Sequence, residues 1–455
     1  MEILMKGFSV GNFKSFNDIQ SISFATSKIT KHSTHIYKTK KGQYLKSAIV
    51  FGANASGKSN LIKAISFSRN IILNGLNNVN LSDHHFRLNE KGYHQPGIFQ
   101  YDLIIDDQEY FYGLAISYAR GVIENEWLIR VNDESSQTII FYRSLNDQSL
   151  SEVETAYPKK GNEKFFSYLD DFSSDLAEPL MEKTILADIA TRAKPTEEPL
   201  KYIKRLYDYL SDMVILFPNV KYHFINEIDK LYEEKHFYEN ILNDFDMDID
   251  SLTISKEKMN LDQLFSQMDD GIKGSEFAFI SKIASNHPIA YRLGDQIYMI
   301  RKENDGRLIY NKLQIDHGNP NNLFELADES EGTKRLFDLI PLLKDDGKSR
   351  IMIIDEMDRS LHTNLIKQFI QFFFEMHANS CVQLLATAQN TNILDLKLLR
   401  QDEIWFVERQ IDHSSHIYSL NKFKERSDQD VQKDYLLGRY GAIPFFRDSF
   451  LEKDE

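Results

Sequence analysis

The sequence predicts a mixed α/β protein in which an antiparallel β region and a compact helical insertion are added to a parallel sheet. Three observations predict this class. A glycine-containing loop, Gly52 to Ser59, lies between a strand pattern and a helical pattern. Short aromatic and β-branched runs fill residues 99–143, as in an antiparallel sheet. From Phe324 onward strand and helix patterns alternate, which is typical of a parallel sheet with crossover helices.

The composition is that of a folded protein without a membrane span. Hydrophobic residues make up 42% and charged residues 27% of the 455 residues, which separates the chain from disordered sequences. No apolar run reaches the roughly 18 residues of a membrane span, and the first residues show no signal-peptide pattern. The single cysteine, Cys381, cannot form an internal disulfide. We therefore expect a cytoplasmic protein that contacts no membrane.

The elements around the loop follow in order. The runs "GFSVGNFKSF" and "IQSISFAT" near the start alternate apolar and polar side chains, as half-buried strands do. The apolar run Ala48 to Phe51 is the strand that enters the loop. Apolar residues recur around helical spacing from Leu61 to Leu73, so the loop leads from a strand into a helix.

The patterns divide the chain into three parts. Residues 1–160 hold the loop and the antiparallel β region. Helical periodicity then dominates, which predicts a helical insertion over residues 161–275. Strand patterns return after Gly294, and residues 276–455 hold the alternating strands and helices with the remaining motifs.

The loop fits the phosphate-loop spacing GxxxxGK(S/T). Its glycines permit a tight turn, so that backbone N–H groups surround phosphate oxygens at the positive end of the following helix. Lys58 would reach the β and γ phosphates of ATP, and Ser59 would offer its hydroxyl to Mg²⁺. The candidate nucleotide-binding residues are Gly52, Asn54, Ala55, Ser56, Gly57, Lys58, Ser59 and Asn60.

A second motif, "IMIIDEMDRSLH", places two carboxylates after a buried strand pattern. Asp355 can hold magnesium together with Ser59, and Glu356 stands where a base polarises the attacking water. An Asp-Glu pair after an apolar run is by itself an ordinary strand end. Together with a phosphate loop it favours ATP hydrolysis, with Glu356 and Lys58 as catalytic residues.

A third motif, "ESEGTKRL", begins a predicted helix with Ser330, Gly332 and Thr333. A hydroxyl and a glycine at a helix N-terminus offer a second anion-binding site. Taken alone, the same pattern is more often an ordinary N-cap.

In this order the three motifs resemble the nucleotide-binding heads of ABC-type ATPases related to SMC and RecF proteins. More narrowly, the chain resembles the RloA and AbiL type ATPases of bacterial phage-defence loci, which are relatives of the ATPase half of overcoming-lysogenization-defect nucleases and of the PARIS ATPase subunit. The resemblance is dense over residues 1–75 and 320–446. It rests on "VGNFKSFND", "ESEGTKRLFDLIPLL", "DEMDRSLHTNLI", "QNTNILD", "DEIWFVE", "IYSL" and "YLLGRYGAIP".

The resemblance implies an ABC-type P-loop ATPase head built from the first and third parts of the chain. In such heads the signature motif of one subunit closes over the γ-phosphate held by the other. Ser330, Gly332 and Thr333 would therefore bind the ATP of a partner subunit. The segment Ser360 to His362 would be the D-loop that lines the dimer interface.

One position departs from the family pattern. Where the family has a switch histidine, the sequence "LLATAQNTNILD" places Gln389. A glutamine amide can donate a hydrogen bond but cannot exchange a proton near neutral pH. Slow hydrolysis and unimpaired hydrolysis both stay open, because Glu356 is retained as a base.

The resemblance implies an ATP-binding and hydrolysing sensor or regulatory subunit of an anti-phage defence system. It would form a homodimer or a higher homo-oligomer through ATP and control a separate effector, which we expect to be a Toprim-type nuclease. We expect any such nuclease to be another polypeptide, because the sequence ends at Glu455, soon after the Asp355 strand. A nucleic acid or a phage protein would be the trigger.

Two alternatives stay open. One is a RecF-like ATPase of DNA repair or DNA-end sensing. The net charge of -14 argues against a surface that binds nucleic acid throughout, though a local basic groove is compatible with it. The other is a nucleotide-gated scaffold with little hydrolysis, which Gln389 favours.

Overall fold

The computed structural model divides the chain into two compact units. Unit 1 comprises Met1–Ile215, Asp345–Asp358 and Ile370–Glu455, and unit 2 comprises Leu216–Lys344 and Arg359–Phe369. The structure describes residues 2–76, 79–132, 136–145, 151–173, 182–218, 225–255, 258–262, 280, 289–423 and 429–443.

A largely parallel sheet forms the centre of unit 1. Its strands, in spatial order, are β11 (Val214–Leu216), β19 (Arg350–Ile354), β20 (Val382–Thr387), β5 (Ser47–Phe51), β21 (Ile404–Arg409) and β22 (Ser415–Ser419). Strands β19, β20, β5 and β21 pair in parallel, and β22 pairs antiparallel with β21. Every residue of β5 is buried, which explains its continuous apolar pattern. The predicted parallel sheet is confirmed.

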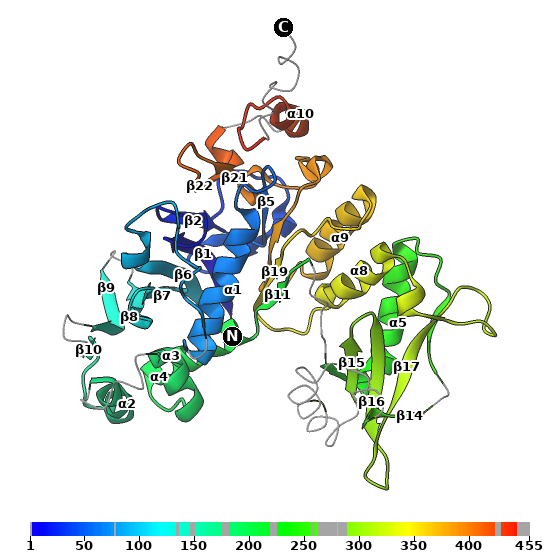
Figure 1. Ribbon diagram of the computed structural model, residues 1–455, viewed down its shortest axis with the longest axis horizontal. Coiled ribbons are helices and arrows are strands. Elements are labelled where there is room, and N and C mark those ends of the chain that lie inside the picture. The colour runs from blue at the N-terminus through cyan, green and yellow to red at the C-terminus, as the bar shows by residue number, and fades with distance from the viewer. Residues whose placement is uncertain are drawn as a thin grey trace. The chain divides into compact units, whose positions relative to one another are not determined.

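Helix α1 (Lys58–Asn74) follows β5 after the phosphate loop. It packs against the antiparallel sheet and against helices α3 (Ile185–Arg192) and α4 (Glu198–Ser211), as Figure 1 shows. It buries Leu61, Ile62 and Ile65, which recur at helical spacing. The helix ends at Gly75, whose φ of 78° lies in the left-handed region. The remaining helices of unit 1 are α2 (Glu163–Ser173), the C-terminal part of α9 (Thr363–Met376) and α10 (Val431–Leu436).

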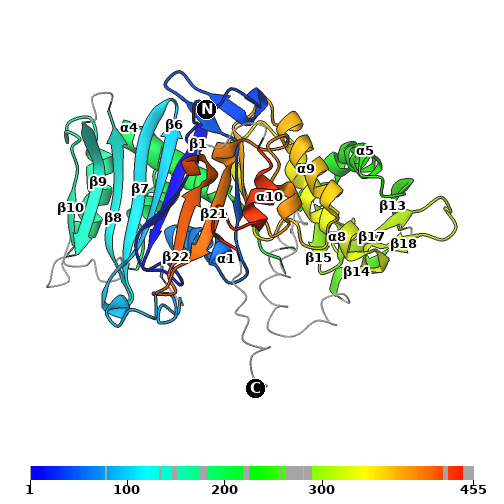
Figure 2. The same ribbon diagram turned by 90° about the horizontal axis from the view of Figure 1, so that it is seen from above.

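An antiparallel sheet forms the second layer of unit 1, and Figure 2 shows its strands side by side. Its order is β10 (Ser151–Glu154), β9 (Gln137–Leu145), β8 (Val122–Val131), β7 (Gln108–Ser117), β6 (Gly97–Ile105), β1 (Ile3–Gly11) and β2 (Gln20–Ser23). The runs predicted as antiparallel strands over residues 99–143 form β6 to β9. Between β2 and β5 in the chain, β3 (Ile36–Lys38) and β4 (Gln43–Leu45) form a small antiparallel hairpin.

A buried glutamine joins the two sheets of unit 1. Gln383 on β20 has no exposed surface. Its Oε1 accepts a hydrogen bond from Met5 N at 2.7 Å, and its Nε2 donates to Met5 O and Leu45 O, both at 2.9 Å. All three bonds satisfy backbone groups that the strand pairing leaves over, so the polar side chain is stable in the core.

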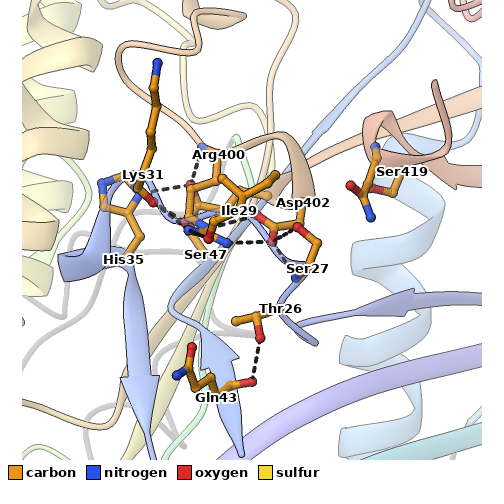
Figure 3. A network of polar contacts seen from close by, with 12 residues as sticks. Thr26, Ser27, Ile29, Lys31, His35, Gln43, Ser47, Arg400, Asp402 and Ser419 are labelled. Carbon is orange, nitrogen blue, oxygen red and sulfur yellow. Dashed lines mark hydrogen bonds and ion pairs between the residues drawn. The ribbon is translucent and has the colours of Figure 1, made fainter. Parts of the chain in front are cut away.

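A buried arginine joins residues 27–31 to the segment before β21, as Figure 3 shows. The guanidinium of Arg400 donates to Asp402 at 2.8 and 2.9 Å and to the carbonyl oxygens of Ile29 and Lys31 at 3.0 and 2.6 Å. The carboxylate of Asp402 also accepts hydrogen bonds from the backbone N–H and the hydroxyl of Ser27, both at 2.7 Å. Because every charge is paired and hydrogen-bonded, this cluster is compatible with burial.

Unit 2 is built on an antiparallel sheet. Its order is β12 (Ile225–Glu227), β15 (Ile289–Leu293), β16 (Gln296–Lys302), β17 (Leu308–Asp316) and β13 (Ser251–Ile254), with β14 (Met259–Asn260) and β18 (Phe324–Glu325) also pairing with β17. Its helices are α5 (Ile228–Asp244), α8 (Glu331–Leu339) and the N-terminal part of α9.

The range predicted as a helical insertion, 161–275, is divided between the two units. Helices α2 to α4 belong to unit 1, and α5 belongs to unit 2. Short strands β11 to β14 are interspersed among these helices. Residues 263–275 of the predicted range lie outside the described residues.

Single 3-10 turns complete the described elements: η1 (Ser33–His35), η2 (Gly92–His94), η4 (Leu326–Asp328), η5 (Ile340–Leu343), η6 (Thr391–Ile393), η7 (Gln401–Glu403) and η8 (Leu420–Phe423). The predicted fold class is confirmed: a mixed α/β chain whose phosphate-loop strand is central in a parallel sheet, with an antiparallel β subdomain. Within the described part of the chain, no helix is both long and apolar enough to cross a bilayer.

Candidate nucleotide-binding site

The loop between β5 and α1 has a backbone that only glycine permits at two positions. Gly52 has a φ of 155° and Gly57 a φ of 115°. A Cβ on Gly52 would overlap the carbonyl oxygen of Val407, and a Cβ on Gly57 would overlap the hydroxyl of Ser415. The neighbouring strands β21 and β22 therefore lie directly behind the loop. This explains both glycines of the motif in steric terms.

The side chain of Lys58 folds back over the loop. Its Nζ donates to the carbonyl oxygens of Gly52 at 2.7 Å and Ala53 at 3.0 Å, and the residue is 6% exposed. Burial lowers the pKa of Lys58, while Asp358, Asp355 and Glu356 act in the opposite direction. The two hydrogen bonds place the ammonium group at the loop.

Ser59, Asp355 and Thr387 form a connected polar cluster beside the loop. Oδ1 of Asp355 accepts hydrogen bonds from the Ser59 hydroxyl at 3.1 Å and from the Thr387 hydroxyl at 2.6 Å. The predicted pair of metal ligands is therefore brought together, although 296 positions separate the two residues. Asp355 is 2% exposed, and its position at the end of β19 fixes it against the first turn of α1.

Glu356 adopts a left-handed backbone conformation with a φ of 50°. Its N–H donates to the Thr387 hydroxyl at 2.8 Å, and its Oε1 accepts a hydrogen bond from Nε2 of Gln389 at 3.0 Å. Left-handed backbone at a non-glycine residue costs of the order of 1–3 kcal/mol and is found at functional sites more often than elsewhere. The structure thus brings the predicted base and the predicted switch residue into direct contact.

A further carboxylate holds the switch segment. Oδ2 of Asp358 accepts hydrogen bonds from the backbone N–H of Gln389 at 2.8 Å and of Asn390 at 2.5 Å. The Asp355 turn and the end of β20 are therefore joined through both side chain and backbone, because Met357 N also donates to Thr387 O at 2.9 Å.

The residues present fit a nucleotide with magnesium. The hydroxyl of Ser56 is buried in the loop without a hydrogen-bond partner, and it faces Gly52. The N-terminal N–H groups of the 17-residue helix α1 are directed at the same loop. Mg²⁺ usually takes one or two protein oxygens beside substrate phosphates and water, and Ser59 and Asp355 supply two. Asn54 and Ala55 are exposed at the rim of the loop.

A cavity of about 380 Å³ lies at the N-terminal end of α1. Its lining includes Lys14, Ser15, Asn60 and Arg409. Nδ2 of Asn60 donates to the Ser15 hydroxyl at 2.9 Å, so this candidate residue faces the cavity rather than the magnesium pair. Burial, followed by the charge of Arg87, lowers the pKa of Lys14.

The signature candidates belong to unit 2. The hydroxyl of Ser330 accepts a hydrogen bond from Thr333 N at 3.1 Å, and the two hydroxyl groups lie 2.9 Å apart. Ser330 thus acts as the N-cap of α8, with Glu331 in the first turn. A Cβ on Gly332 would stand 3.0 Å from the carbonyl oxygen of Ser360, so the D-loop candidate passes close to the signature glycine.

Sequence reasoning missed Thr387, Asp358 and Ser415. Thr387 donates to the Asp355 carboxylate and accepts the backbone N–H of Glu356, Asp358 holds the switch segment, and Ser415 closes the back of the loop through a hydrogen bond to Ser56 O at 2.5 Å. A hydroxyl at the end of the apolar run "VQLLAT" was a signal for Thr387. Nothing in the sequence places Ser415 next to Gly57.

Comparison with known proteins gives one family. A family described as "AAA domain, putative AbiEii toxin, Type IV TA system" matches residues 47–395, which include the phosphate loop, the signature candidates and both carboxylates. A comparison with curated proteins gives no match.

Similar solved structures include SMC head domains. One is an SMC head bound to the C-winged helix domain of ScpA, at 14% identity and a TM-score of 0.41, covering 93% of this chain and 100% of that one. Another is the SMC head domain from Thermotoga maritima, at 13% identity and a TM-score of 0.33, covering 91% and 98%. A third, from Pyrococcus furiosus, has an extended coiled coil and is bound to the C-terminal domain of ScpA, at 14% identity and a TM-score of 0.36, covering 93% and 98%. At TM-scores below 0.5 these similarities carry no weight for function.

Proposed function

We propose, from the premise that this chain belongs to the AAA-domain family described as "AAA domain, putative AbiEii toxin, Type IV TA system", that it binds ATP with Mg²⁺ and hydrolyses the nucleotide. The observation that carries the proposal is the convergence on Asp355. Its carboxylate receives the Ser59 hydroxyl from the phosphate loop and the Thr387 hydroxyl from β20. Ser59, Asp355 and Thr387 come from separate parts of the chain, and together they form a polar cluster that suits a magnesium ion.

The side chains divide the work of hydrolysis. Lys58 exchanges two loop carbonyls for phosphate oxygens, and the peptide N–H groups of the loop bind the same phosphates. Ser59 and Asp355 would hold a magnesium ion, which would supply neutralisation of the phosphate charge. Glu356 takes the proton of the attacking water, and the Gln389 amide orients its carboxylate.

Nucleotide binding is tested by isothermal titration of the full chain with ATP and MgCl₂. We expect saturable binding that Lys58→Ala weakens at least about 10-fold, because a charge-assisted contact to phosphate is lost. Ser59→Ala should weaken ATP binding in the presence of magnesium more than ATP binding in its absence. Binding that survives Lys58→Ala unchanged would exclude this loop as the nucleotide site.

The signature residues are proposed to act on a second copy of the chain. The support is the N-cap geometry of Ser330, which leaves the first turn of α8 with a positive end, together with the motif order. ATP would then bring two heads together, with each phosphate loop facing the other copy's α8.

A matched pair of variants tests this dimer. Asp and Asn both replace Ser as N-caps without loss of helix stability, but only Asp brings a negative charge that repels phosphate. In a Glu356→Gln background with saturating ATP, we expect Ser330→Asn to dimerise and Ser330→Asp to stay monomeric by light scattering. Equal behaviour of the two variants would contradict a role in trans.

We propose that the same ATP-dependent dimer serves as the sensor or regulatory subunit of an anti-phage defence system and controls a separate effector. The first effector to test is a Toprim-type nuclease encoded beside it. The support is the resemblance of the motifs to ATPases of phage-defence loci. Co-purified nuclease should show a different affinity for the ATP-locked Glu356→Gln protein than for Lys58→Ala. Equal affinity would exclude nucleotide control of that effector.

A nucleotide-gated scaffold with little hydrolysis is a second candidate. The contact between Gln389 and Glu356 favours it, because a glutamine at the switch offers no titratable group. Tight, Lys58-dependent ATP binding with turnover no faster than that of Glu356→Gln would select the scaffold.

A further inference from the structure

The motif "YLLGRYGAIP" has no role in the site described so far, and it lies beyond the matched range 47–395. Residues 435–443 of it are described. Tyr435 and Tyr440 are 5% and 2% exposed, and both rings stack on Phe406 of β21, with ring centroids 5.4 and 5.8 Å apart. The hydroxyl of Tyr418 donates to Tyr440 O at 2.5 Å. The segment is therefore anchored on the strand that neighbours β5.

The anchored segment ends in a backbone contact with the phosphate loop. The carbonyl oxygen of Ala442 accepts hydrogen bonds from Ala53 N and from the Tyr435 hydroxyl, both at 2.8 Å. Ala442 has a φ of 56°, is 1% exposed, and donates its own N–H to Oε1 of Glu408 at 3.2 Å. A non-glycine residue stays in this conformation only where its surroundings determine it, and here both its N–H and its carbonyl are bound.

Ala53 connects this contact to the nucleotide side of the loop. Its N–H is held by Ala442, and its carbonyl oxygen accepts hydrogen bonds from Ser56 N at 3.2 Å and from Lys58 Nζ at 3.0 Å. The peptides that flank Ala53 are therefore fixed from behind by the C-terminal segment and from the front by Lys58.

We propose that Tyr435, Gly441 and Ala442, here named the C-terminal strut, position the phosphate loop and thereby set its affinity for nucleotide. This inference rests on the proposed ATP site and extends it to a segment outside the matched family range. Because the contact is made through the Ala442 carbonyl, it depends on backbone geometry and on the Tyr435 hydroxyl rather than on the side chain of Ala442.

Gly441 offers a way to move the strut, with a matched control elsewhere. Gly441 has a φ of 71°, and a Cβ there would stand 2.7 Å from Oε1 of Glu408 and 2.9 Å from the Tyr418 hydroxyl. Gly121 has a similar φ of 68° in a turn with no heavy atom within 4 Å of the added Cβ. Gly121→Ala therefore imposes the same backbone strain without displacing Ala442.

The experiment compares ATP affinity in the presence of Mg²⁺, melting temperature and amide exchange of the full-length protein. Tyr435→Phe keeps the ring on Phe406 and removes only the hydroxyl that holds Ala442. We expect it to weaken ATP binding about 3- to 10-fold, the effect of one hydrogen bond. Gly441→Ala should weaken binding at least about 10-fold, and Gly121→Ala less than about 2-fold.

Amide exchange separates the strut from the ATP site itself. Without nucleotide, the phosphate-loop peptide containing Ala53 should exchange faster in Tyr435→Phe than in the wild type, whether or not ATP binds. If Gly441→Ala does not fold, Tyr435→Phe decides alone. The strut is overturned if a folded Tyr435→Phe protein keeps wild-type exchange and, where the wild type binds ATP, wild-type affinity. Absence of Lys58-dependent ATP binding in the wild type would instead overturn the proposed function.

Discussion

The side-chain amide of Gln389 donates a hydrogen bond to the carboxylate of Glu356, with Nε2 and Oε1 3.0 Å apart. The residue that replaces the expected switch histidine therefore contacts the proposed base directly. An amide donor stabilises the charged carboxylate and fixes its direction, although it cannot relay a proton. This contact predicts a role for Gln389 in the rate of hydrolysis and no role in nucleotide affinity.

We expect Gln389→Ala to lower kcat about 10-fold, less than the loss from Glu356→Gln, because orientation is lost and the base is kept. The KM for ATP should change less than about 2-fold. Steady-state phosphate release measures both. An unchanged kcat would show that the contact does not take part in the reaction. A large increase in KM would instead place Gln389 in nucleotide binding.

Asp358 is predicted to hold the switch segment through its carboxylate. Asp358→Asn replaces a charged acceptor with a neutral amide, so the N–H groups of Gln389 and Asn390 lose their strongest partner. We expect faster amide exchange of the peptide containing residues 389 and 390. The peptide containing Ala53 should not change. If the peptide containing residues 389 and 390 exchanges at the same rate in the variant as in the wild type, Asp358 does not hold the switch segment.

A buried ion pair is predicted to stabilise unit 2. Arg292 on β15 and Asp338 on α8 are 0% and 2% exposed, and their side chains are paired. Arg292→Met should lower the free energy of unfolding by about 3–5 kcal/mol, because a buried carboxylate loses its main partner. The double variant with Asp338→Leu should recover much of that loss.

Urea unfolding of the full chain checks the two predicted changes in the free energy of unfolding, with Arg301→Met as the control. The side chain of Arg301 is 40% exposed and pairs with Glu303 at 3.8 Å, so its loss should cost less than about 1 kcal/mol. A double variant that is less stable than Arg292→Met would contradict the account.

His84 is predicted to make the protein sensitive to mild acid. Burial, and after it the charge of Lys14, lowers the pKa of His84 to about 4, while Asp83 acts in the opposite direction. The folded state thus keeps His84 neutral where the unfolded chain already binds a proton. The stability contribution is fully present above the unfolded pKa of 6.5 and is lost as the pH falls toward about 4.

His84→Phe removes this proton uptake and preserves the packing, because the His84 ring lies 4.4 Å from Phe67 between ring centroids. We expect a smaller drop in melting temperature between pH 7 and pH 5 than in the wild type. His236→Gln, at a side chain that is 81% exposed, should leave the drop unchanged. Parallel pH curves for wild type and His84→Phe would exclude the effect.

Local patterns predicted the parallel sheet and the antiparallel sheet of unit 1 because their elements are long and strongly periodic. The apolar strand β5, the loop and α1 form one continuous signal, and so do β19 and its two carboxylates. Strands β13 and β14 were not predicted. They span four and two residues, and they pair with β17 more than 40 positions later in the chain. Runs of four and two residues are too short to show a clear alternation of apolar and polar side chains.

The site was predictable where one motif carried the chemistry and not where contacts join distant segments. The spacing of the motif identified Lys58 and Ser59, and Asp355 followed from its strand. The contact of Ala53 with Ala442 joins residues separated by most of the chain, and the bridge from Gln383 to Met5 involves a polar residue inside an apolar run. Such contacts depend on the arrangement of the sheets, which no local pattern encodes.

The measurement that tests the central claim most directly is magnesium-dependent ATP turnover by the purified full-length protein, compared with Lys58→Ala and Glu356→Gln. The account predicts turnover in the wild type, loss of both binding and turnover in Lys58→Ala, and retained binding with kcat reduced about 10²- to 10⁴-fold in Glu356→Gln. Turnover that persists at the wild-type rate in Glu356→Gln would contradict it, because the carboxylate that accepts the Gln389 hydrogen bond would then not be the base.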